Sequence, residues 1–171
     1  TKCFKFLVYF STISYGIDFS TKAIEIATDA GLECEKVDVD QGLPMADSSF
    51  DVVGCKSLLG GIAKNDPNNI NNAIKEIYRV LKPGGFIFSK TFSTGMSGES
   101  TAVAMDGEPN TFLEMPDGPL RKDYGIIRLT SENEITKIYH LFSNLEYDLT
   151  TRTDRNRSKE LSEWVIQGIK G

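Results

Sequence analysis

Long apolar runs and cysteines are scarce in this sequence of 171 residues. The run FLVYF at residues 6–10 is far shorter than the roughly 20 apolar residues of a membrane-spanning helix. It is also shorter than the core of a signal peptide, and no small-residue cleavage site follows it. The three cysteines, Cys3, Cys34 and Cys55, have no metal-ligand spacing and are odd in number. We therefore expect a cytoplasmic protein with no membrane segment, no metal site and no disulfide framework.

An excess of basic charge is also absent. There are 24 acidic and 19 basic side chains, the net charge is -5, and the basic residues are scattered along the chain. A nucleic-acid partner is therefore not expected. Hydrophobic residues make up 40% and charged residues 25% of the chain, as in an ordinary globular protein. The length predicts one domain over residues 1–171, large enough for a buried core.

Segments with strand and helix character alternate in the first half of the chain. The sequence predicts strands at YGID (15–18), LECEKVDVD (32–40), FDVVGCKSLL (50–59) and FIFSKTF (86–92). Helices are predicted between them at residues 21–30, with Ser20 as the N-cap and Gly31 beyond the end, and at residues 66–82. This alternation predicts an α/β fold with a doubly wound, mostly parallel sheet.

The pattern changes after Phe92. Residues 93–125 carry prolines and glycines without a period, so we expect a long excursion that forms part of a substrate cover. A helix is predicted at residues 130–145, with a capping box at Ser131 and Glu134 and an apolar stripe that includes Phe142 and Leu145. The strands LEYDLTTRT (145–153) and SEWVIQGI (162–169) are too close for a helical crossover, so they should pair antiparallel. Residues 1–92, 93–125 and 126–171 thus form three parts of the single domain.

Two carboxylates stand at predicted strand ends. Asp18 ends one strand and Asp38 lies near the end of the next. In an open α/β sheet, ligands bind beyond the carboxyl ends of the strands, and a carboxylate there can accept hydrogen bonds from both hydroxyls of a ribose. Each aspartate could also be a turn former or a helix cap. His140, the single histidine, lies off the apolar face of its helix and should face solvent, whereas Trp164 should be core.

Three segments taken in order carry a family resemblance: YGIDFSTKAIEIA, VDVDQGLPMADSSFDVV and EIYRVLKPGGFIF. They resemble the class I S-adenosylmethionine-dependent methyltransferases of the small-molecule branch, which have a Rossmann-like sheet with a C-terminal antiparallel pair. The resemblance implies S-adenosylmethionine as cofactor and a small-molecule methyl acceptor. It also implies that Asp18 holds the ribose, that Phe19 packs near the adenine, and that Asp38 and the Val39 amide recognise the adenine edge. Cys55, at the end of the fourth strand of the family, would face the methionine and the substrate.

One part of that family pattern is missing from the sequence. The family has a first strand and a glycine-rich loop ahead of the strand that ends in Asp18, but the first glycine here is Gly16. The run KFLVYF (5–10) is separated from the next strand only by STIS, too few residues for a parallel crossover. It fits the tail of the preceding helix instead, so the fold is expected to be N-terminally truncated. A fragment, an incomplete sequence and a gap filled by a homo-oligomeric partner at the exposed sheet edge all remain open.

Two other functions stay open at this point. Asp18 could equally hold the ribose of NAD in an oxidoreductase. The missing loop also fits a catalytically inactive methyltransferase-like remnant or subunit. The sequence names no catalytic residue, and methyl transfer from a sulfonium requires mainly alignment and exclusion of water.

Overall fold

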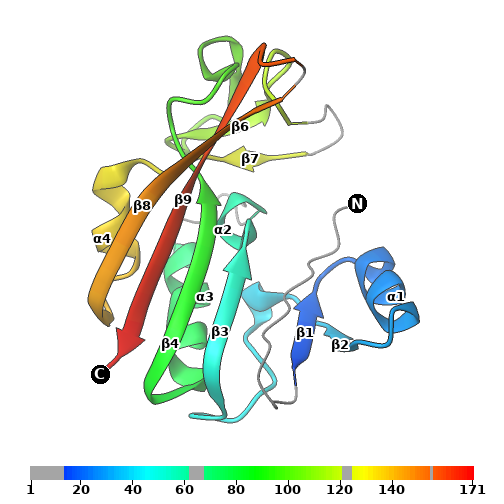
Figure 1. The fold of residues 1–171 in the computed structure, drawn as a ribbon, viewed down its shortest axis with the longest axis vertical. Helices are drawn as coiled ribbons and strands as arrows, with labels where there is room; N and C mark the ends of the chain where they lie inside the picture. Colours follow the sequence, from blue (N-terminus) through cyan, green and yellow to red (C-terminus); the bar gives the residue numbers. More distant parts are fainter. Residues whose placement is uncertain (1–13, 62–67, 121–124, 155) are drawn as a thin grey trace.

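The strands of this computed structural model, which describes residues 14–61, 68–120, 125–154 and 156–171, form three sheets (Figure 1). The main sheet has the order β3 (Phe50–Lys56), β4 (Leu81–Phe92), β9 (Lys159–Lys170) and β8 (Phe142–Asp154). β3 and β4 run parallel, whereas β9 runs antiparallel to both β4 and β8. The predicted combination of parallel strands with an antiparallel C-terminal pair is therefore confirmed, in a mixed sheet.

A separate two-stranded parallel sheet contains β1 (Tyr15–Asp18) and β2 (Glu33–Lys36). β1 points in the same direction as β3 and β4 in Figure 1, but within the described residues no backbone ladder joins it to the main sheet. The connection from β2 to β3 runs through the 3-10 turn η1 (Val39–Gln41), so the strand predicted over residues 32–40 is shorter than expected. The run KFLVYF (5–10), predicted to be the tail of a preceding helix, lies outside the described residues.

Two helices cover one face of the main sheet. These are α3 (Asn68–Val80) and α4 (Glu132–Ile138). Their apolar sides share one core with the sheet, and its buried members include Ile74, Ile77, Leu81, Ile87, Ile135, Tyr139, Trp164 and Ile166. Trp164 is buried and His140 is exposed, as predicted. No helix among the described residues is long and apolar enough to cross a membrane.

The ends of α1 (Thr21–Asp29) and α4 have the predicted caps. The Ser20 hydroxyl accepts a hydrogen bond from the Ala23 amide at 3.3 Å, and Gly31 follows the helix with a φ of 80°. Ser131 and Glu134 form the capping box of α4. The prediction that this helix extends to residue 145 is wrong, because β8 begins at Phe142. Phe142 still contributes to the core, but from a strand.

Residues 93–120 hold more regular structure than their sequence suggests. β5 (Val103–Ala104) and β6 (Thr111–Glu114) pair antiparallel, and β6 also pairs with β7 (Ile127–Arg128). A second apolar cluster beneath them contains Phe92, Met96, Met115, Ile127, Leu129 and Leu161. Strands of two to four residues are too short to show a period, which explains why the sequence predicted only an excursion. The remaining elements are the short helix α2 (Leu58–Gly61) and the 3-10 turn η2 (Glu99–Thr101).

Candidate functional site

The carboxyl ends of β1 and β2 bring the two predicted carboxylate segments together. Asp18 is in register with Lys36, and the Val37 amide donates to the Asp18 carbonyl at 3.1 Å. Asp38 follows at once, and its carbonyl accepts the Gln41 amide at 2.9 Å to start the turn η1. The structure thus places Asp18 and Asp38 at neighbouring ends of parallel strands, the edge at which α/β sheets bind ligands.

Asp18 also has a structural function. Its Oδ1 atom accepts a hydrogen bond from the Ser20 amide at 2.7 Å, which forms a turn immediately before α1. No described residue donates a hydrogen bond to Oδ2. One oxygen of the carboxylate therefore orders the chain, and the other accepts no hydrogen bond from the described part of the chain.

Phe19 and Val39 differ in their surroundings. Phe19 is 73% exposed at the end of β1, the highest value among the exposed large hydrophobic side chains of the described residues. Val39 packs against the main core, so its side chain does not face solvent fully. An exposed phenyl ring beside a carboxylate offers a flat apolar surface and a hydrogen-bond acceptor side by side.

Cys55 lies near the end of β3 with its side chain in the main core. Burial raises the pKa of its thiol to about 12, so the thiol is protonated at neutral pH. Ser57, two residues later, has a φ of 55°, and its amide donates to the Lys90 carbonyl at 2.7 Å. Because the thiol of Cys55 belongs to the core, the backbone of this strand end is the part that can face a ligand. The predicted contact of Cys55 with a cofactor stays a prediction.

Two residues that the sequence did not single out hold the loop after η1. The Arg79 guanidinium on α3 donates to the carbonyls of Leu43 and Met45, both at 2.8 Å, and to Asp47 Oδ1 at 2.7 Å. It also donates to both oxygens of Glu76, whose Oε2 accepts the Leu43 amide at 2.8 Å. The hydrogen bond from Arg79 lowers the pKa of Glu76. The segments GLPMADSS and EIYRV are therefore joined in space, which a search for strand-end residues could not reveal.

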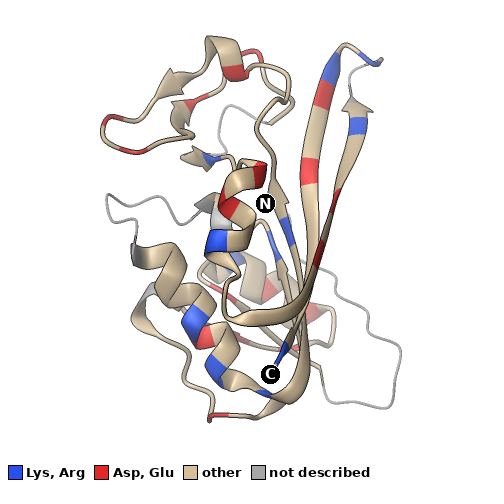
Figure 2. Ribbon diagram, turned by 90° about the vertical axis from the view of Figure 1, so that its left-hand side faces the viewer, with Lys and Arg blue, Asp and Glu red and all other residues tan. Residues whose placement is uncertain are grey.

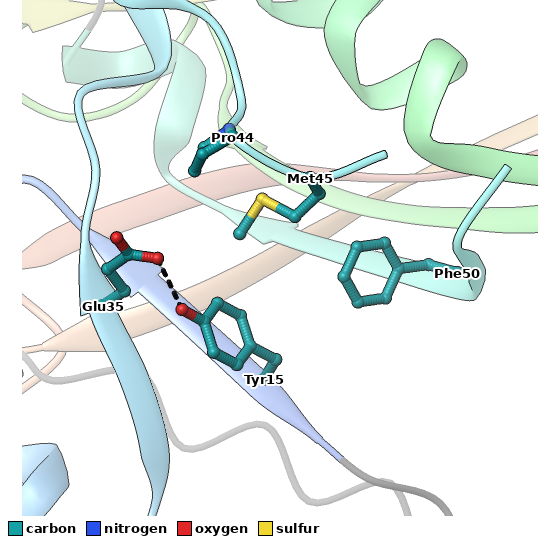
Figure 3. Close-up of a pocket in the computed structure, with 5 residues that line it drawn as sticks. All are labelled: Tyr15, Glu35, Pro44, Met45 and Phe50. Carbon is teal, nitrogen blue, oxygen red and sulfur yellow. Dashed lines mark hydrogen bonds between the residues drawn. The ribbon is translucent and has the colours of Figure 1, made fainter. Parts of the chain in front are cut away.

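An open hollow of about 330 Å³ lies between the β1–β2 sheet and the start of β3 in the main sheet (Figure 3). Tyr15, Glu35, Pro44, Met45 and Phe50 line it, and the Tyr15 hydroxyl donates to Glu35 Oε2 at 2.6 Å. This hydrogen bond raises the pKa of Tyr15 to about 12. Tyr15 and Phe50 are the first residues of β1 and β3, so this wall of the hollow lies at the amino ends of these strands, whereas Asp18 lies at the carboxyl end of β1.

A second hollow, of about 300 Å³, lies between α3, α4 and β7. Arg128 and Glu134 at its wall form an ion pair at 2.7 Å. Glu134 also accepts hydrogen bonds from the Ser131 amide and hydroxyl and from Asn110 Nδ2. Burial acts to raise the pKa of Glu134, but these hydrogen bonds and Arg128 outweigh it and lower the pKa. This network connects the three-stranded sheet of β5, β6 and β7, hereafter the small sheet, to α4.

The small sheet lies beyond the carboxyl ends of β3 and β4 (Figure 1). The Thr130 amide donates to the Phe92 carbonyl at 2.8 Å, and the Ser97 amide donates to the Glu160 carbonyl at 3.1 Å. These hydrogen bonds fix Ser97 to β9 and Thr130 to the end of β4. The described residues contain no group of three or more side chains suited to hold a metal ion.

Carboxylates directly after two neighbouring parallel strands, here Asp18 after β1 and Asp38 after β2, occupy the strand ends at which nucleotide-binding α/β folds hold their ligands. Residues 4–89, just over half of the chain, match the family described as Methyltransferase domain. The chain belongs to this family, which confirms the resemblance found in the sequence.

Among curated proteins, demethylmenaquinone methyltransferase of Staphylococcus epidermidis is 36% identical over 76 residues. That match covers 42% of this chain and 30% of the relative, so the chain spans less than a third of the length of this relative. The corresponding protein of Staphylococcus aureus is 38% identical over the same length.

Solved structures show the same fold over nearly the whole chain. A SAM-dependent methyltransferase from Methanosarcina mazei has a TM-score of 0.73 at 23% identity, covering 91% of this chain and 81% of its own. A methyltransferase from Thermotoga maritima, described as a possible histamine N-methyltransferase, has a TM-score of 0.64 at 19% identity, covering 91% and 72%. The predicted Rossmann-like methyltransferase fold is confirmed.

Proposed function

We propose that this chain binds S-adenosylmethionine and transfers its methyl group to a small-molecule acceptor in the cytoplasm. Membership of the methyltransferase domain family supports the reaction class. The net charge of -5 supports a small molecule rather than a nucleic acid as acceptor. Cys34 and Cys55 are free thiols, which suits a reducing compartment.

The observation that carries the proposal is the arrangement of Asp18, Phe19 and Asp38. Asp18 keeps one carboxylate oxygen for a ribose hydroxyl, because its other oxygen is bonded to the Ser20 amide. Phe19 exposes its ring at the same strand end, and Asp38 follows the neighbouring strand. These groups fit the adenosine part of the cofactor: a diol, a flat base and an amino group.

S-adenosylmethionine supplies an activated methyl group on a sulfonium when it is bound. Asp18 would hold the ribose and Asp38 the adenine edge, with Val39 contributing its backbone amide. Phe19 would cover the base and remove its own ring from water. The small sheet would exclude water from the strand ends and shape the acceptor site, which makes residues 93–125 part of the substrate cover.

Isothermal titration of S-adenosylmethionine and S-adenosylhomocysteine into the chain tests this proposal, with NAD as a comparison. Asp18→Asn is the informative variant, because an amide oxygen can still accept the Ser20 amide while the negative charge is lost. The matched control is Glu25→Gln, which removes one charge from the exposed Lys22–Glu25 pair on α1. We expect saturable S-adenosyl binding that weakens at least about tenfold, the effect of a charged hydrogen bond, in Asp18→Asn and not in the control.

The alternatives give different results. Saturable NAD binding without S-adenosyl binding would favour the oxidoreductase. S-adenosyl binding without methyl transfer to any acceptor in a small-molecule screen would favour the inactive remnant. No binding by a chain with a normal circular dichroism spectrum and a cooperative melt would refute cofactor binding by these residues.

A further inference from the structure

The outer edge of β8 is an open sheet edge. β8 is thirteen residues long and ends the strand order β3-β4-β9-β8. Within the described residues no strand pairs with its outer side, and the hydrogen bonds of Ser93 and Ser97 go to β9 instead. In Figure 2 the β8–β9 hairpin forms one side of the molecule. The backbone groups on this edge form a template for another strand.

Residues 147–153 of this edge carry few of the features that block strand pairing. The segment YDLTTRT contains no proline, lysine or glycine and consists mainly of residues that favour strands. Its side chains are exposed, including Tyr147 at 37% and Leu149 at 46%. The register shift of β8 lies earlier, between Ser143 and Glu146, so residues 147–154 pair regularly with β9.

The order of charges in this segment is complementary to itself. If two copies of β8 pair antiparallel around a two-fold axis at Thr150, Asp148 of each copy lies opposite Arg152 of the other. Leu149 then lies opposite Thr151, and Tyr147 lies opposite Thr153. Directly opposed residues of antiparallel strands point to the same face, so each of the two Asp–Arg pairs can form an ion pair.

Asp148 and Arg152 are suited to this contact. Neither forms an ion pair within the described residues, although Asp148 Oδ1 accepts the Leu149 amide at 2.8 Å. A register centred on Leu149 would place Arg152 opposite Glu146. Glu146 already accepts a hydrogen bond from the side chain of Gln167 on β9 and borders the register shift, so the register centred on Thr150 is favoured.

We propose that two copies of this chain associate through β8, antiparallel and centred on Thr150, so that their four-stranded sheets join into one continuous sheet. The homo-oligomer that the sequence left open was placed at a different edge, beside the strand that ends in Asp18. The β8 interface is independent of cofactor binding, so its failure and that of the proposed function are separate results.

Sedimentation velocity over a range of concentrations tests the charge pattern. We expect the natural chain to form dimers, and we expect Asp148→Arg and Arg152→Asp each to weaken dimerisation by about tenfold or more, because two opposed like-charge contacts replace two ion pairs. Combining both substitutions in one chain should restore the dimer. The control Glu25→Lys reverses a charge on α1 and should have no effect. Two results would overturn the proposal. One is a natural chain that stays monomeric at about 100 µM, a dissociation constant expected of a weak specific dimer. The other is a double variant that does not recover the dimer.

Cross-linking tests the register separately. A cysteine at position 150 would face its own copy across the axis, with the two Cβ atoms roughly 4.5–5.5 Å apart. Thr150→Cys should therefore form a disulfide-linked dimer on oxidation with diamide, and Thr153→Cys, which would face Tyr147, should not. The natural chain under the same oxidant gives the background from its own three cysteines. Equal cross-linking at the two positions would refute the register.

Discussion

Replacement of Arg79 by lysine should cost more stability than its conservative chemistry suggests. Arg79 makes five hydrogen bonds, two of them to the carbonyls of Leu43 and Met45. A lysine ammonium keeps the charge but cannot span these acceptors, because its donors share one nitrogen. Loss of a charged donor at the two carbonyls costs about 1 kcal/mol each. The partly exposed pairs with Glu76 and Asp47 add about 0.5–1 kcal/mol.

The expected loss for Arg79→Lys is therefore about 2–3 kcal/mol of unfolding free energy, from the hydrogen-bond and ion-pair contributions above. For a chain of this length that corresponds to a fall in Tm of about 5–10 °C. Urea denaturation gives the free energy, and hydrogen exchange at the Leu43 amide, which is bonded to Glu76, gives the local effect.

Lys82→Gln is the matched control for Arg79→Lys. It breaks the Lys82–Asp51 pair, whose side chains are 45% and 73% exposed, and should cost less than about 0.5 kcal/mol. If Arg79→Lys costs no more than this control, the loop is not held by the guanidinium and the argument fails.

Two further predictions concern titration and thiol reactivity. Glu134 has a lowered pKa, so it stabilises the folded chain above its unfolded pKa near 4.5, and this stability is lost as the pH falls through the lower folded value. Glu134→Gln should therefore lower the unfolding free energy at pH 7 by about 1–3 kcal/mol and flatten the acid limb of the stability profile; an unchanged acid limb would contradict the assignment. At pH 8, iodoacetamide should modify Cys34 in the folded chain much faster than Cys55, because Cys55 is buried and its thiol pKa is raised to about 12. Mass spectrometry of the labelled peptides measures both rates, and equal rates would show that the core around Cys55 opens readily.

The sequence predicted the parallel strands, the two helix caps and the antiparallel C-terminal pair, because each has a local signal. Ser20 and Ser131 are polar residues directly before apolar periodic segments, and such caps act within one helical turn. The apolar spacing around Phe142 led to the wrong prediction of a helix there, because a buried residue can belong either to a helix or to a strand. Burial alone does not distinguish the two.

The parts that the sequence missed depend on contacts between distant segments. Arg79 contacts residues more than thirty positions away, and nothing in its own neighbourhood marks it as a clamp. The pairing of β5, β6 and β7 likewise joins short segments across turns. The strand-end positions of Asp18 and Asp38 were predictable, but the hydrogen bond from the Ser20 amide to one oxygen of Asp18 is a feature of the folded turn and was not.

The separation of the β1–β2 sheet from the main sheet has a thermodynamic consequence. Asp18, Phe19 and Asp38 belong to one unit and the end of β3 to another, and no backbone ladder joins the two within the described residues. A ligand that contacts both units would fix their relative positions, and the loss of their relative motion would reduce its net binding free energy. The affinity for the ligand would then depend on how rigidly the β1–β2 sheet is held against the main sheet. Any contact that immobilises the β1–β2 sheet before the ligand binds would strengthen binding without contacting the ligand. The hydrogen bonds of Arg79 to residues 43–47 and a neighbouring chain are two such contacts.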